Sequence, residues 1–159
     1  MVTASIGVPV RKAVTDGLVT HFASLSDFNG ATAPEREVVV SFAYAFGSQH
    51  TEQVYTGRSR ADTPPAALRS GRNTRNESGE FDLIVMVKYM GGDGYDAELR
   101  AEDIGGEVED WFADRKNNEL GVTGLLSLIV TGWVAEYAQV DGGSAALRQY
   151  TVRWTARLE

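Results

Sequence analysis

The sequence has no cysteine among its 159 residues and only two histidines, His21 and His50. Disulfides, thiolate metal sites and cysteine nucleophiles are therefore excluded. His21 falls in a predicted helix and His50 in a predicted turn, where structural roles explain both better than general-base catalysis. Gly91 to Asp96 places acids beside glycines, but it lacks the spacing and the closing glutamate of an EF-hand. A turn followed by a helix cap explains that segment better, so we expect no metal site.

The motifs of common enzyme classes are missing too. The sequence contains no GxSxG nucleophile elbow, no Walker phosphate loop and no HExxH zinc motif. The residues therefore indicate none of these common enzyme classes.

Long apolar runs and an excess of positive charge are also absent. No run approaches the ~20 apolar residues that span a membrane, and Met1 to Val10 lacks the pattern of a signal peptide, so we expect a cytoplasmic origin without a membrane partner. Basic residues number 15 and acidic residues 22, and the net charge of −7 argues against a general nucleic-acid binder. A hydrophobic fraction of 43% and a charged fraction of 23% are typical of a globular chain. At this length, residues 1–159 are expected to form a single domain.

Apolar residues at helical spacing predict two helices. The first covers Pro9 to Ser24. The second starts with Asp96 as its N-cap and ends near Arg115 and Lys116, which suit the negative end of the helix dipole. Gly105-Gly106 in its middle predicts a close approach to a sheet. The apolar positions are Val10, Val14, Leu18, Phe22 and Leu25 in the first helix, and Ala97, Ala101, Ile104, Val108, Trp111 and Phe112 in the second.

Alternating apolar and polar residues predict five strands. Asp141 to Ser144 is a hairpin signal between the last two strands, and Gly132 marks a possible bulge. Phe81 to Met90 is apolar on much of both faces, which places it at the centre of the sheet. The expected strands are Glu37 to Phe46, Glu52 to Thr56, Phe81 to Met90, Leu125 to Val140, and a final strand that includes Tyr150 to Leu158.

The predicted order is therefore α-β-β-β-α-β-β with hairpin-like links. It indicates the α+β class, with an antiparallel or mixed β-sheet and two helices packed on one side. A long arginine-rich loop is expected between strands 2 and 3, from Gly57 to Gly79. Five of the 15 basic residues fall in these 23 positions. They are Arg58, Arg60, Arg69, Arg72 and Arg75.

Charge is segregated between this loop and the second helix. The loop can be a solvated segment, a docking element ordered by a partner protein, or a phosphate contact. It holds no aromatic residue, which argues against base stacking. Acids crowd the helix face opposite the apolar stripe, and that face is either simply solvated or a charged surface of an assembly or channel. The acids are Glu98, Glu102, Asp103, Glu107, Glu109, Asp110 and Asp114.

The order of elements resembles that of tail terminator proteins of long-tailed bacteriophages. More specific are Gly57-Arg58 with the arginine-rich segment, and Glu77-Ser78-Gly79-Glu80-Phe81 leading into the strand Asp82 to Tyr89. A helix and the ending Asn117 to Val122 follow. These segments are similar to those of tail terminators from siphophages of actinobacterial hosts, and the resemblance extends from Val10 to Leu158.

The resemblance implies a structural virion protein located in the tail neck and assembled in the host cytoplasm. It also implies that the protein is not an enzyme and binds no cofactor. Such proteins form a homo-hexameric ring on the head-proximal end of the tail tube, stop its polymerisation and offer a docking surface to the head-tail connector. Genomic DNA passes through the lumen without specific binding. The alternatives are another neck or head-completion protein of the virion, or a small ligand-binding or enzymatic α+β domain.

Contacts with an adjacent subunit, the tube or the connector are expected from the segregated charges. The acids of the second helix are expected either at a subunit boundary or along the lumen, where negative charge would keep DNA from adhering. The candidate contact residues are Arg58, Arg60, Arg69, Arg72, Arg75, Glu102, Glu109 and Asp110.

Overall fold

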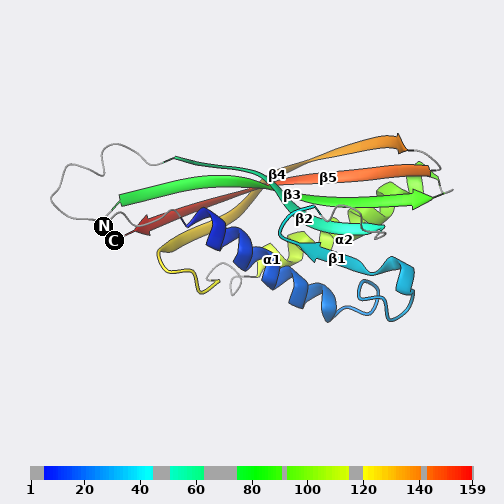
Figure 1. The fold of residues 1–159 in the computed structure, drawn as a ribbon, viewed down its shortest axis with the longest axis horizontal. Helices are drawn as coiled ribbons and strands as arrows, with labels where there is room; N and C mark the ends of the chain where they lie inside the picture. Colours follow the sequence, from blue (N-terminus) through cyan, green and yellow to red (C-terminus); the bar gives the residue numbers. More distant parts are fainter. Residues whose placement is uncertain are drawn as a thin grey trace.

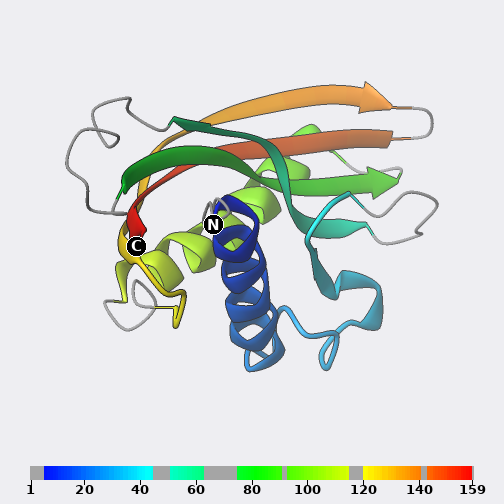
Figure 2. The same ribbon diagram turned by 60° about the vertical axis from the view of Figure 1, so that its left-hand side comes forward.

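The computed structural model describes residues 6–44, 51–62, 75–90, 93–114, 120–140 and 143–158. A five-stranded mixed sheet carries two helices on one face (Figure 1), and the view in Figure 2 shows the same layering. This arrangement confirms the α+β class and the predicted order of elements. The elements are α1 (Gly7–Ala23), a 3-10 turn η1 (Pro34–Arg36), β1 (Val38–Ser41), β2 (Glu52–Asp62), β3 (Arg75–Met90), α2 (Gly94–Ala113), β4 (Leu125–Val140) and β5 (Gly143–Leu158).

The strands follow the order β1-β2-β3-β5-β4, so β3 lies at the centre as predicted. β4 and β5 pair in an antiparallel register that closes at Val140 and Gly143, which confirms the predicted hairpin. Their register shifts between Val130 and Gly132, which confirms the bulge at the glycine. β5, the last strand in the sequence, is inserted between β3 and β4.

The first pair of strands differs from the prediction. β1 pairs with β2 in parallel, with Val38 opposite Glu52, so the link is a crossover and not a hairpin. β1 is also shorter than expected, because the chain leaves the ladder after Ser41. Phe42 instead accepts a hydrogen bond from the Thr56 hydroxyl through its carbonyl oxygen, and the Arg11 guanidinium lies 4.3 Å from the centre of its ring. The predicted end at Phe46 and turn at residues 47–50 lie outside the described residues.

β2 and β3 are longer than predicted. Ser59 to Asp62, expected in the loop, pair with Ser78 to Phe81 of β3 in an antiparallel ladder, beyond a register shift at Gly57 and Arg58. Arg75 to Glu77, also expected in the loop, extend β3 alongside β5. The sequence pattern does not reveal this pairing, because the outer part of β2 has no apolar face and so lacks the alternation that predicts a strand. The remaining expected loop, residues 63–74, lies outside the described residues.

The start of α2 also corrects the prediction. Asp93 is the N-cap, and its side chain accepts a hydrogen bond from the backbone N–H of Tyr95 at 3.2 Å. The predicted cap, Asp96, instead lies in the first turn, where its charge suits the positive end of the helix dipole. The predicted closing residues Arg115 and Lys116 lie outside the described residues.

One core joins both helices to the inner face of the sheet. The two predicted apolar stripes are buried, apart from Leu25, which is partly buried at the margin of the core. The largest fully buried side chains come mainly from the central strands and α1. They include Trp154, Tyr150, Phe22, Phe81, Leu18 and Leu83.

Two glycines allow the helices to approach their neighbours closely. A Cβ on Gly17 of α1 would lie 2.3 Å from Cζ2 of Trp111, so glycine is what lets α1 cross α2 at this point. A Cβ on Gly105 would lie 2.4 Å from the Tyr150 hydroxyl, which confirms the close approach to the sheet. A Cβ on its neighbour Gly106 would have no such atom within 4 Å. The predicted close approach to the sheet therefore holds for Gly105 and not for Gly106.

These adjacent glycines provide a matched stability test. We expect Gly105→Ala to lower the free energy of unfolding by about 1–3 kcal/mol, because the hydroxyl of buried Tyr150 and the Arg148 side chain leave no room for a methyl group. Gly106→Ala is expected to raise it by about 0.5–1 kcal/mol, because alanine favours the helix and meets nothing. Urea unfolding of both variants measures the difference, and equal effects would contradict the close contact.

Candidate functional site

A buried ion pair joins the sheet to α2, and sequence reasoning did not identify it. Glu52 at the start of β2 is 1% exposed and Arg100 of α2 is 8% exposed. The guanidinium donates to both carboxylate oxygens, from Nε at 2.9 and 3.1 Å and from Nη2 at 2.9 Å. Such bidentate geometry holds the two elements in one relative position.

The same arginine organises the segment between α1 and β1. Its Nη2 also donates to the backbone carbonyl oxygens of Asp27, at 2.9 Å, and Arg36, at 3.3 Å. Its guanidinium lies 4.6 Å from the centre of the Phe28 ring. Arg100 therefore holds β2, α2 and the residues that lead into β1 together.

A hollow of about 460 Å³ opens beside this pair. Asp103 and Glu107 of α2 line it together with Arg36 and Arg100. Glu107 also lies 3.0 Å from Nε2 of His21 on α1. Arg36 and Arg100 of the hollow both contact Glu52 of β2. The charged side chains that line the hollow therefore join α1, α2 and β2.

The described arginines of the predicted loop lie on the outer part of β2. The side chains of Arg58 and Arg60 are 87% and 71% exposed. Arg60 donates to Glu80 at 2.9 Å, and Arg58 lies 3.9 Å from Asp82. Arg153 of β5 approaches the same Glu80 carboxylate at 3.6 Å. The structure thus gathers a row of charges across the sheet face that is opposite the helices.

The other predicted arginines are less informative. Arg75 is the first residue of β3 and pairs with Leu158 of β5 through the backbone. Arg69 and Arg72 lie outside the described residues.

The predicted acids of α2 occupy different environments. Glu102 and Glu98 line a groove of about 280 Å³ against β4 and β5, with Trp133 and Arg148 across from them. The Arg148 guanidinium lies 4.0 Å from the centre of the Trp133 ring. Asp110 is exposed in the last turns of the helix. The structure does not bring the acids and the arginines of β2 together within one subunit.

Glu109 has a specific partner in the sheet. The hydroxyl of buried Tyr150 donates to its Oε1 at 3.1 Å. Burial raises the pKa of Tyr150 to about 12, and the negative charge of Glu109 adds to the shift. Glu109 is therefore a packing contact of the sheet as well as a surface charge.

β4 is the strand at one edge of the sheet (Figure 1). It exposes a row of large apolar side chains. Their exposed fractions lie between 46% and 66%. No motif in the sequence indicates that this strand is an edge, although the alternation predicts the strand itself. The residues are Leu126, Ile129, Trp133, Val134 and Tyr137.

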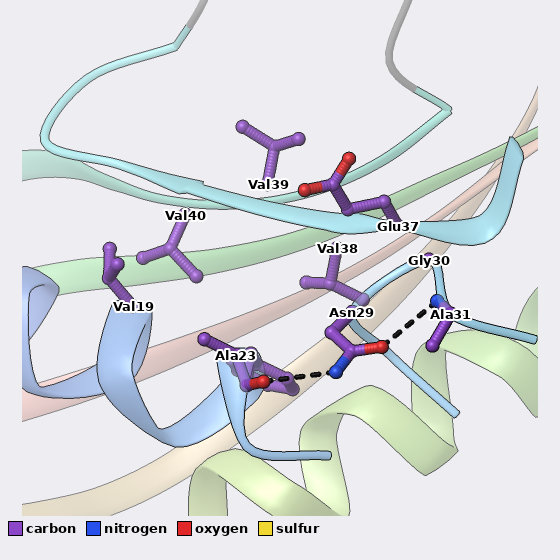
Figure 3. A pocket seen from close by; sticks show the side chains of 10 residues that line it. Val19, Ala23, Asn29, Gly30, Ala31, Glu37, Val38, Val39 and Val40 are labelled. Carbon is purple, nitrogen blue, oxygen red and sulfur yellow. Dashed lines mark hydrogen bonds between the residues drawn. The ribbon is translucent and has the colours of Figure 1, made fainter. Parts of the chain in front are cut away.

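An apolar hollow of about 590 Å³ lies between α1 and β1 (Figure 3). Val19, Val38 and Val40 contribute apolar surface, and Glu37 is the single ionisable residue of its lining. Asn29 spans its rim, donating to the Ala23 carbonyl at 3.0 Å and accepting from the Ala31 N–H at 2.9 Å. This lining lacks the paired acid and base or the nucleophile that a hydrolytic site requires.

Among the described residues, no group of three or more His, Asp or Glu side chains could hold a metal ion. None of the helices in the same part of the chain is long and apolar enough to cross a membrane.

Comparison with known proteins shows a likeness of fold. No family model matches the chain, and no curated protein matches it. Among solved structures, a chain described as "Virion of native gene transfer agent (GTA) particle" is similar, with a TM-score of 0.55 and 14% sequence identity. The alignment covers 96% of this chain and 100% of the other, so the two share the fold along almost their whole length.

The ion pair predicts a large difference between buried and surface arginines. We expect Arg100→Ala to lower the free energy of unfolding by about 3–5 kcal/mol, because it leaves the Glu52 carboxylate buried without its main partner. Arg60→Ala breaks an exposed pair and is expected to cost about 0–1 kcal/mol. Chemical denaturation of both variants is the measurement, and similar losses would refute the structural role of Arg100.

The raised pKa of Tyr150 predicts a loss of stability in alkali. Its ordinary value is about 10, so the stabilisation from the shift is complete below that pH. It is lost as the pH rises toward about 12. The unfolding free energy of the wild type should therefore fall more steeply across this range than that of Tyr150→Phe. Parallel slopes for the two proteins would contradict this assignment.

Proposed function

We propose that this protein is a structural virion component that caps the head-proximal end of a long phage tail tube. In this role six copies close into a ring, the ring ends polymerisation of the tube protein, and its other face receives the head-tail connector. DNA passes through the lumen without specific binding. The capping role requires surfaces that recognise neighbours and does not require bond-making chemistry.

The fold likeness to a virion chain is the observation that carries this proposal. It extends over 96% of this chain and 100% of the virion chain. The sequence resemblance to siphophage tail terminators, which rests on Glu77 to Phe81 and the segments around it, favours a terminator over other virion components. An actinobacterial host is part of the same proposal.

The described surface supports a role in assembly. The apolar row on β4 is larger than isolated exposed residues would explain, and extended apolar patches mark interaction sites. Arg58 and Arg60 extend from another part of the sheet. Acids line the groove beside β4, at Glu98 and Glu102. Opposite charges on separate surfaces favour association between copies, because they select partner and register.

The charges also define the remaining candidate contacts. We propose that Arg58, Arg60 and Glu102 contact an adjacent subunit. Asp110 is exposed and free to contact the tube, the connector or the lumen. Arg69, Arg72, Arg75 and Glu109 stay candidates from the sequence, although the hydrogen bond from Tyr150 gives Glu109 a packing role as well.

Electron microscopy of the purified protein mixed with tail tubes tests the proposal. The expected result is a ring with six-fold symmetry seated at one end of each tube, and tubes that no longer grow when tube protein is added. A homogeneous six-copy ring corresponds to about 104 kDa for subunits of 17.3 kDa. Native mass spectrometry supplies the mass independently.

Two controls separate the alternatives. Bovine albumin in place of the protein should leave both tube ends free and growing. Binding to isolated heads but never to tubes would favour a head-completion protein of the virion. A monomer that binds neither structure, at any concentration, would contradict a role in the neck.

A further inference from the structure

We propose that the ring closes edge to edge: β4 of one copy lies antiparallel against the outer part of β2, residues Gly57 to Asp62, of the next copy. This inference rests on the proposed ring and names the surfaces that form it. The sheets of neighbouring copies would then continue into one another through backbone hydrogen bonds.

The β4 edge is the first half of this interface. β4 is sixteen residues long and pairs only with β5 within the described part of the chain. Its opposite side therefore presents backbone donors and acceptors to an incoming strand. Exposed apolar side chains, such as Ile129 and Val134, flank that backbone. A long apolar edge without charge or proline in its centre is a template for strand addition.

The second half is an edge left open by the shortness of β1. β1 pairs with β2 only from Glu52 to Tyr55, because its last residue is Ser41. Beyond Tyr55, β2 pairs with β3 on one side, and no described strand pairs with its other side. Residues Arg58 to Asp62 are all exposed. The parallel crossover thus leaves the outer part of β2 as an available edge.

The direction of the strands favours pairing between these two edges. β4 is antiparallel to β5, β5 to β3, and β3 to β2, so β4 and β2 run in opposite directions within one subunit. Rotation about an axis roughly along the strands preserves this relation between neighbours. The two edges would therefore meet as an antiparallel pair, which supports regular hydrogen bonding.

The charges beside the two edges are complementary. β4 itself carries one charged residue, the exposed Glu136. The β2 edge presents Arg58 and Arg60, whose side chains are mostly exposed. Attraction between these groups would align the edges, while two copies of the same edge would meet with like charges.

Because the edges differ, the contact is head-to-tail. A contact between two different surfaces repeats from copy to copy and closes into a ring when the rotation allows it. A contact of β4 with a second β4 would instead stop at a two-fold dimer. The two modes are therefore distinguishable by which chains become linked.

Cross-linking in this cysteine-free protein tests the proposal directly. Ile129→Cys places a thiol on the β4 edge, and Arg60→Cys places one on the β2 edge. A mixture of the two chains, treated with a short bismaleimide, is expected to yield a dimer containing one of each. A chain carrying both substitutions is expected to yield a ladder that ends at six copies.

The single variants are the first controls. Ile129→Cys alone should give little dimer, and a strong homodimer would overturn the proposal in favour of a two-fold β4 contact. Leu99→Cys, a partly exposed position on α2, should not link to Arg60→Cys. Circular dichroism and thermal unfolding establish that each variant folds like the parent.

Microscopy of the same samples separates this inference from the proposed function. Six-fold rings without the Ile129-to-Arg60 product would overturn the edge pairing while leaving the capping role intact. Absence of both rings and cross-linked product, in solution and on tubes, would overturn both. The double substitution Ile129→Lys and Val134→Lys, made in a chain that forms rings, is expected to abolish the rings without unfolding the monomer.

Discussion

The fold depends on one charged contact at its centre, the pair between Glu52 and Arg100. Removing both charges from water carries a large cost, and only the bidentate geometry and the added carbonyl contacts offset it. An apolar contact could slide, whereas this one specifies a single placement of α2 against β2. It also holds the residues before β1, through the carbonyl oxygen of Arg36. The pair therefore connects β2, α2 and the segment that leads into β1.

The periodic parts of the chain were predictable and the ion pair was not. Helical spacing identified both helices because their buried residues recur every three or four positions, and alternation identified β5 because one of its faces is apolar. Glu52 and Arg100 lie far apart in the sequence, and each occupies a position where a charged residue is ordinarily exposed. Only the folded chain brings them together, so no local pattern reveals them.

The errors in the strands have physical causes as well. The outer part of β2 reads as loop because arginines alternate with small residues, and Ser78 to Glu80, which pair with it, also lack large apolar side chains. The parallel pairing of β1 was missed because a turn signal between two strands predicts a hairpin. The candidate arginines at 58 and 60 were thus found by composition, while their position on an open edge required the structure. The exposed apolar row of β4 was missed because alternation does not distinguish an edge strand from an interior one.

The insertion of β5 between β3 and β4 has a consequence for biosynthesis. β5, which follows both neighbours in the sequence, supplies each of them with a hydrogen-bonding partner. A nascent chain released before residue 143 therefore leaves β4 with no place in the sheet, however complete α1, α2 and β3 are. The five-stranded sheet is therefore completed only when β5 is in place, because β5 alone connects β4 to the other three strands.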